Sequence, residues 1–153
     1  MKKVILLIAL SFFVISPSHS LAAQTDRCQP VKAIFNSSVN VKNGVCQMHL
    51  TRKEPQVIMM GHALSPEMMD MALSANFQLV GEKAEVVGEF ALLEEEVNPV
   101  IDALRKGGID ISAVHNHMIG EQPKIYFLHF EAMGNMNDLA KTVKSAVDKV
   151  SYQ

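Results

Sequence analysis

The stretch that decides the fold is EVVGEFALLEEEVNPVIDALRKGG, residues 85–108. Its first part, residues 85–93, alternates apolar and polar side chains and predicts a strand. One side of that strand carries Val86, Gly88, Phe90 and Leu92. Residues 97–108 predict a helix, because acids precede it, where the helix dipole favours them, and basic residues and glycine end it. One face of the helix carries apolar residues at 3,4 spacing, namely Val97, Val100, Ile101 and Leu104.

Two more strands and a second helix follow this unit. Residues 109–118 and 124–131 are typical of strands, and residues 119–123 form the turn between them. The final helix starts after residues 134–137, and its apolar stripe is Leu139, Val143, Ala146, Val147 and Val150. The order β-α-β-β-α predicts a parallel pair joined by a right-handed crossover, then an antiparallel hairpin, with both helices on one face. We therefore expect an α+β protein with a ferredoxin-like core.

The residues before this core predict further strands that extend the sheet or cover its other face. Residues 24–44 are polar and rich in turn formers, and Asn43-Gly44 predicts a turn into a strand over residues 45–50. Residues 56–60 could be the hairpin partner of that strand. The sequence Ser65-Pro66-Glu67 has the form of a helix start. The short helix expected there is lined by Met68, Met69, Met71, Ala72, Leu73 and Phe77.

Two clusters allow a metal-site interpretation beside a structural one. The methionines of residues 68–71 carry thioethers, which are ligands for copper, but methionine also fills irregular gaps in a core. The acids of residues 94–96 could hold a cation, but the start of a helix favours carboxylates without one. In both clusters the structural interpretation requires fewer assumptions.

The chain begins with the pattern of an export signal. Lys2 and Lys3 precede a mostly apolar run over residues 4–15, and small residues follow up to Ala23. The apolar run is shorter than the ~20 residues of a membrane-spanning helix. We therefore expect a signal peptide over residues 1–23, one mature domain over residues 24–153, and a periplasmic or secreted location.

Charge and cysteine content narrow the classes of partner. After removal of the signal peptide the chain has 12 basic and 16 acidic side chains, a formal charge of −4. This balance offers no electrostatic surface for nucleic acid and no polybasic patch for a membrane, so we expect a small molecule or a protein as partner. Cys28 and Cys46 are the only cysteines of the sequence. In an oxidising compartment they predict a disulfide, and the alternative is a thiol metal site that lacks C-x-x-C spacing.

Three histidines fall within fifteen residues, on the two strands of the predicted hairpin. Side chains alternate along a strand, so His115 and His117 point to the same side. The expected register places His117 opposite Ile125 and Ala113 opposite His129. All three histidines, the third being His129, then share one face, and their imidazoles could close on one ion.

Neutral imidazole suits zinc and other divalent transition metals, and three histidines with an open fourth position are typical of a catalytic zinc site. We therefore expect a divalent metal, with zinc as the first candidate, bound by the three histidines. Glu121 in the turn and Glu131 on the second strand are candidate fourth ligands or general bases for metal-assisted hydrolysis. Asn116, on the reverse face, braces the hairpin or hydrogen-bonds a bound ligand. In the alternative, the protein is a non-catalytic module for a small ligand or a protein, and the histidines are structural, so enzymatic activity stays open.

Two blocks of the sequence are GEFALLEEEVNPV, residues 88–100, and AVHNHMIGEQP, residues 113–123, continuing to His129-Phe130. Both resemble segments of the LppY/LpqO-like family of bacterial exported proteins. The resemblance implies export, and it implies that the family's own motif includes His115, Asn116, His117, Glu121, Pro123 and His129. The family is a domain of unknown function, so the resemblance implies no particular activity.

Overall fold

The computed structural model describes residues 27–151, and the predicted signal peptide lies outside these residues. Along the chain the elements are α2 (Gln29–Phe35), the short 3-10 helix η1 (Asn36–Ser38), β1 (Val39–Lys42), β2 (Val45–Thr51), β3 (Val57–Met59), β4 (His62–Leu64), β5 (Ala72–Val80), β6 (Lys83–Leu92), α3 (Glu94–Lys106), β7 (Asp110–Asn116), β8 (Tyr126–Gly134) and α4 (Met136–Val147). No helix within residues 27–151 has the length and apolar composition that crossing a membrane requires.

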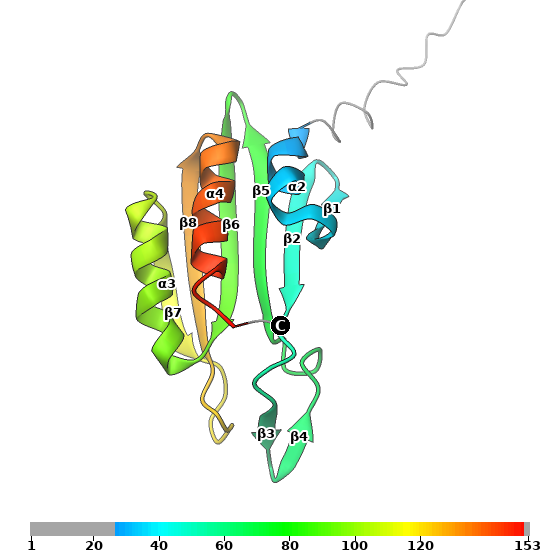
Figure 1. Cartoon of the computed structure of the whole chain (residues 1–153), viewed down its shortest axis with the longest axis vertical. Coiled ribbons are helices and arrows are strands. Elements are labelled where there is room, and N and C mark those ends of the chain that lie inside the picture. Colours follow the sequence, from blue (N-terminus) through cyan, green and yellow to red (C-terminus); the bar gives the residue numbers. More distant parts are fainter. Residues whose placement is uncertain (1–26, 152–153) are drawn as a thin grey trace, which may run out of the picture.

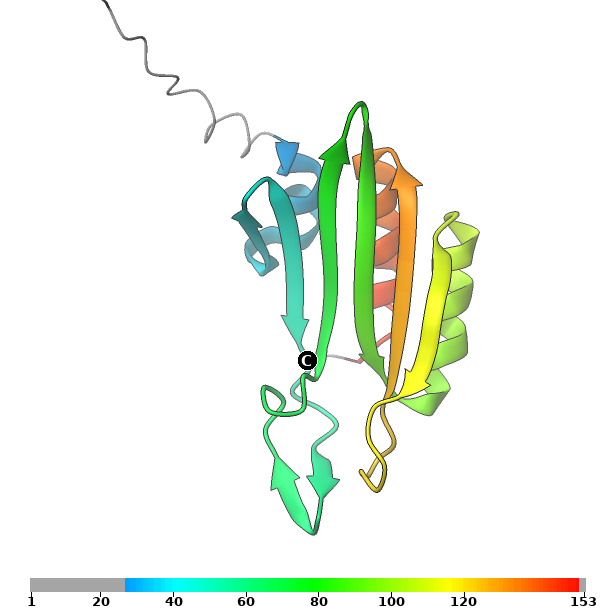
Figure 2. The ribbon, with the colours of Figure 1, turned by 180° about the vertical axis from the view of Figure 1, so that it is seen from behind.

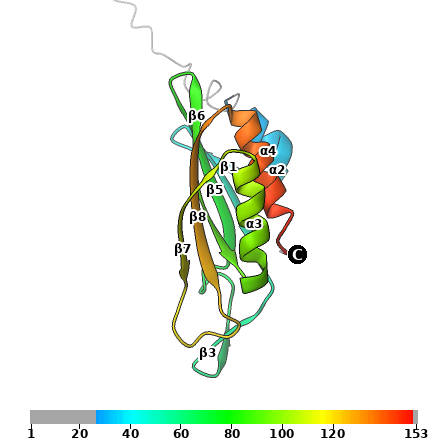
Figure 3. The ribbon, with the colours of Figure 1, turned by 90° about the vertical axis from the view of Figure 1, so that its left-hand side faces the viewer.

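Six strands form one antiparallel sheet in the order β1-β2-β5-β6-β8-β7. The helices α2, α3 and α4 lie on one face of this sheet, and no helix covers the other face, which we call the uncovered face (Figures 1 and 3). The predicted α+β class is confirmed. Strand β8 pairs antiparallel with both β6 and β7, so β6 and β7, which α3 connects, run parallel to each other with β8 between them. This is the split β-α-β arrangement expected for the core, and the N-terminal strands extend the sheet beyond β6.

Alternating sequence explains the core between the sheet and the helices. Along β6 the predicted inward side is fully buried, and Phe90 meets Phe130 of β8 edge to face, with ring centroids 5.0 Å apart. Gly88 lies beneath the Phe130 ring, where a Cβ atom would come within 2.1 Å of it. The stripe predicted for the final helix is buried as well, namely Leu139, Val143, Ala146, Val147 and Val150, the last of which lies beyond the end of α4. Each valine, leucine or phenylalanine side chain contributes ~1.5–3 kcal/mol when it is fully buried.

Two predictions for residues 56–77 are wrong. Strand β3 pairs with β4 in a separate hairpin, whereas β2 lies between β1 and β5. The expected helix is a single turn, closed by a hydrogen bond from Met69 N to Ser65 O, and the chain then enters β5. The chain forms a strand here because every second residue, Leu73, Ala75 and Phe77, is apolar. A strand places these three side chains on the same face, where the helices bury them.

The N-terminal region contains a helix that the sequence did not predict. Helix α2 buries Val31 and Phe35, and its start is joined to β2 by a disulfide between Cys28 and Cys46, whose Cα atoms are 5.6 Å apart. The predicted cysteine pairing is therefore confirmed, and such a bond is typical of proteins from oxidising compartments. The methionine cluster divides between core and surface: Met69 and Met71 are 1% exposed and Met68 is 73% exposed.

Candidate functional site

The hairpin of β7 and β8 has the register expected from its sequence. Ala113 lies opposite His129, and the amide of His117 donates to the carbonyl of Ile125 at 2.8 Å. A bulge between Ile111 and Ala113 adds one residue to β7. Because of this extra residue, Ile111 faces the helices while the histidines face the uncovered side of the sheet.

Side chains from three neighbouring strands meet on the uncovered side. The Nε2 atoms of His115 and His129 are 3.0 Å apart, and the two rings stack with centroids 5.1 Å apart. Glu89 of β6 lies directly opposite His129, and its Oε2 is 3.0 Å from the same Nε2 atom. The His129 and Glu89 side chains are 34% and 37% exposed, so solvent and ions can reach them. Glu89 is the residue of this cluster that the sequence did not identify.

The two contacts at His129 Nε2 compete for one position. A ring nitrogen of neutral histidine carries either one hydrogen or one lone pair, and a carboxylate only accepts. The Nδ1 atom of His115 lies 3.2 Å from the carbonyl oxygen of Asn116, to which it can donate, which leaves a lone pair on its Nε2. Electron pairs of Glu89 and His115 therefore converge beside His129 Nε2. His129 Nε2 can donate its hydrogen to only one of these two acceptors at a time.

His117 is held by a different partner. Its Nδ1 donates to Glu121 Oε2 at 3.0 Å, and its ring packs on Phe127 with centroids 4.6 Å apart. The Glu121 side chain has no exposed surface, and its Oε1 accepts from the amides of Met118 and Ile125, both at 3.1 Å. Glu121 therefore closes the turn between β7 and β8 and orients His117, leaving the Nε2 of that ring without a role in the turn.

The other predicted site residues lie nearby without joining the cluster. Glu131 is exposed on the same face, two residues beyond His129 and opposite Val87 of β6. Asn116 is exposed at the end of β7, opposite Tyr126. In the part of the chain that the structure describes, no group of three or more His, Cys, Asp or Glu side chains has an arrangement that could hold a metal ion as it stands.

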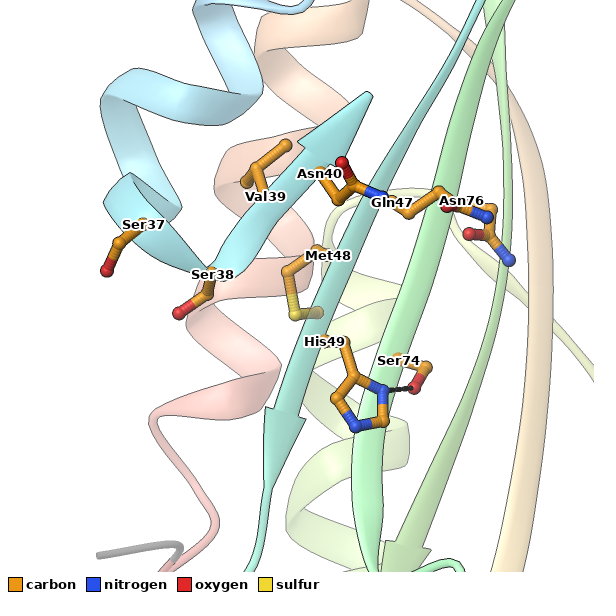
Figure 4. Close-up of a pocket in the computed structure, with 9 residues that line it drawn as sticks. All are labelled: Ser37, Ser38, Val39, Asn40, Gln47, Met48, His49, Ser74 and Asn76. Atoms are coloured by element: carbon orange, nitrogen blue, oxygen red, sulfur yellow. Dashed lines mark hydrogen bonds between the residues drawn. The ribbon is translucent and has the colours of Figure 1, made fainter. Parts of the chain in front are cut away.

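An open surface pocket of about 660 Å³ lies towards the opposite edge of the sheet, around β1, β2 and β5 (Figure 4). Its lining contains no Asp, Glu, Lys or Arg, and consists of Ser37, Ser38, Val39, Asn40, Gln47, Met48, His49, Ser74 and Asn76. His49, to which the sequence gave no role, forms a hydrogen bond of 2.9 Å between its Nδ1 and the hydroxyl of Ser74. The pocket therefore offers amides and hydroxyls to an uncharged polar ligand.

Comparison with known proteins gives a family and no activity. A family described as "Domain of Unknown Function (DUF1259)" matches residues 29–149. No curated protein and no solved structure matches the chain.

Proposed function

We propose that this chain, which belongs to the family described as Domain of Unknown Function (DUF1259), binds a divalent metal ion on the uncovered face of its sheet. Zinc is the first candidate, because the donors are imidazole and carboxylate. One observation carries the proposal: His115 Nε2 and Glu89 Oε2 each lie 3.0 Å from His129 Nε2. The three groups come from three adjacent strands, which hold their backbones in fixed positions.

The donor types suit zinc, and binding would require a small rearrangement of the side chains. Nitrogen and oxygen ligands bind zinc at ~2.0–2.2 Å in a tetrahedron, so that two ligand atoms of one ion lie about 3.3 Å apart. The observed separations are slightly shorter, and rotation of the part-exposed His129 and Glu89 side chains would open a position between them. The carbonyl of Asn116, beside the Nδ1 of His115, would then orient that ring in the way outer contacts orient metal-bound histidines.

The proposal gives separate roles to His117, Glu121 and Glu131. His117 is a further ligand, because a carboxylate on Nδ1 leaves Nε2 free for a metal. In metal-assisted hydrolysis the exposed Glu131 would be the base for a metal-bound water, whereas the enclosed Glu121 would support His117. Asn116 would position a ligand of the ion.

We also propose the finer LppY/LpqO-like assignment and a periplasmic or secreted location. The two sequence blocks, residues 88–100 and 113–123, support the assignment. The basic and apolar order of residues 1–23 and the disulfide between Cys28 and Cys46 support export.

Metal analysis of protein expressed with its own N-terminal segment tests the proposal. The full chain is purified from the periplasm of the host without chelator, and its zinc content and zinc titration are measured. We expect about one equivalent of zinc and a rise in stability of about 2.7 kcal/mol when zinc exceeds its Kd a hundredfold. His129→Ala should abolish binding and Glu89→Gln should weaken it, whereas His62→Ala, an exposed histidine of β4, is the matched control.

Two results would count against a metal. Wild-type protein that is folded, free of metal and unchanged in melting temperature on added zinc would exclude it. Equal zinc content in the wild type, His129→Ala and His62→Ala would show that any binding occurs elsewhere. The zinc affinity of His117→Ala tests the role of His117. A lower affinity than the wild type is expected if His117 binds the ion, and an unchanged affinity is expected if it only supports the turn.

The second candidate function is a non-catalytic module for a small uncharged ligand. The pocket of Figure 4 favours it, because amide and hydroxyl groups line about 660 Å³ without any Asp, Glu, Lys or Arg. Here the histidines of β7 and β8 would be structural. A thermal-shift screen of neutral polar compounds tests it, with Gln47→Ala as the variant that should lose the response and Gln78→Ala, on the neighbouring β5, as control.

A further inference from the structure

Two loops project from the same end of the sheet. They are the β3–β4 hairpin and the connection between β7 and β8 (Figures 1 and 2). Their tips carry large apolar side chains in water: Met60 is 87% exposed and Ile119 is 92% exposed. Behind these tips, Ile58 and Met118 are 45% and 39% exposed. Single exposed apolar residues need no explanation, but here four lie on two adjacent projections.

A second hairpin of the same protein shows that Met60 is not required by its turn. The β1–β2 turn has Asn43 at φ 52° and Gly44 at φ 81°, and the β3–β4 turn has Met60 at φ 51° and Gly61 at φ 79°. The two turns therefore share one backbone geometry. Its first position favours asparagine, because a left-handed backbone is strained for longer side chains. Methionine there is unfavourable for the turn and exposed to solvent, so the fold gains nothing from it.

The two tips are held firmly with respect to each other. The amide of Ile58 donates to the carbonyl of Gln122 at 2.7 Å, and the amide of Gln122 donates back at 3.0 Å. Beneath this bridge lies a separate small core made of Val57, Met69, Met71, Ala91, Ile125 and Phe127. The bridge therefore fixes the bases of the two projections relative to each other.

The surroundings of the tips suit an apolar medium. Residues 55–66 and residues 111–120 contain no Asp, Glu, Lys or Arg. The two loops also project separately from the end of the sheet (Figures 1 and 2), so a protein partner would have to contact both. A fluid lipid layer accommodates two separate projections without matching their shape.

We propose that Met60 and Ile119 insert into the apolar layer of a phospholipid bilayer and hold the protein reversibly at its surface. The sequence predicted no membrane partner because it lacks a basic patch. Insertion of apolar tips needs no such patch, so attachment is expected on uncharged and anionic bilayers alike. The inference is independent of the metal proposal.

Vesicle flotation tests the inference on the full chain purified from the periplasm, in the presence of a chelator. Wild-type protein should float with phosphatidylcholine vesicles, and as well with vesicles that also contain phosphatidylglycerol. Met60→Asn and Ile119→Asn should each lower the partition coefficient about tenfold or more, since each removes one large apolar side chain that the bilayer would bury. Met133→Asn, which is 56% exposed on β8, is the matched control and should float like the wild type.

Fluorescence gives a second readout, because the chain contains no tryptophan. The emission of Met60→Trp should shift to shorter wavelength on addition of vesicles, and that of Met133→Trp should not. Met60→Asn should fold at least as well as wild type, since Asn43 occupies the same turn geometry. Wild-type protein that floats with neither vesicle, or only with the anionic one, overturns the inference, as does unchanged flotation of Met60→Asn combined with Ile119→Asn.

Discussion

Replacing Glu96 with alanine should destabilise the protein more than any other single change at the start of α3. Arg52 is 0% exposed and Glu96 is 7% exposed, and the two form a double hydrogen bond of 2.8 and 2.9 Å. Arg52 also donates to the carbonyls of Ala91 at 2.6 Å and Ser151 at 3.1 Å. The pair therefore joins the end of β2, the end of β6, the start of α3 and the C-terminal segment.

The magnitude follows from the charge that would be left behind. Removing one partner of a buried ion pair leaves the other charge uncompensated, which costs about 3–5 kcal/mol. Glu96 also accepts from the amide of Leu93 at 2.8 Å, and losing this cap adds about 1 kcal/mol. A domain of this size has a free energy of unfolding of about 5–15 kcal/mol, so Glu96→Ala removes a large part of it.

Urea unfolding followed by far-ultraviolet circular dichroism measures the effect. Glu95→Ala, an exposed acid in the same turn of α3, is the control and should cost about 0.5 kcal/mol. Arg52→Met combined with Glu96→Leu should be more stable than Glu96→Ala alone, because no buried charge remains unpaired. A cost below about 1 kcal/mol for Glu96→Ala, or a double variant less stable than the single one, would refute the reasoning.

Three further stability changes follow from the same structure, each measured by urea unfolding. Gly88→Ala should cost about 1–3 kcal/mol, because the new Cβ would overlap the ring of Phe130 in a filled core; no loss would mean that the ring can move. Removing the disulfide through Cys28→Ser and Cys46→Ser should cost about 3 kcal/mol, as expected for a loop of 18 residues, and reducing agent should have the same effect on the wild type. Asn135→Ala should cost about 1 kcal/mol, because its side chain accepts from two amides at the start of α4, and Asn135→Asp should restore most of it.

The C-terminal half could be predicted because its signals are local and repeated. The alternation of residues 85–93, the acids of residues 94–96 and the polar residues of 134–137 each specify their own element. The structure forms all three, with β6 at Lys83–Leu92, α3 starting at Glu94 and α4 starting at Met136. The segment after Ser65 shows where local signals fail. The hydroxyl of Ser65 accepts a hydrogen bond from the amide of Met68, as the cap of a helix does, yet the helix ends after one turn. The alternation that follows fits the core beneath the helices, and this packing outweighs the local preference for a helix.

The site was predictable to the extent that a hairpin register is. The turn around Glu121 aligns Ala113 with His129, and from this register the sequence placed all three histidines on one face. In the structure His115 and His129 meet, whereas His117 pairs with Glu121. Glu89 was missed because it reaches His129 only through the pairing of β6 with β8, which depends on the order of strands in the sheet. Arg52 was missed for the same reason, since its partner Glu96 is 44 residues away in sequence.

The bulge in β7 is where the demands of the core and of the candidate site meet. Ile111 packs against the core on the helix side, and in a regular strand every second residue after it, His115 and His117 included, would face that side too. The extra residue at Ser112 reverses the alternation, so that the strand keeps its apolar contact and still turns both histidines to the uncovered face. Deleting Ser112 should therefore disturb the core and the cluster with His129 together, because one backbone feature positions both.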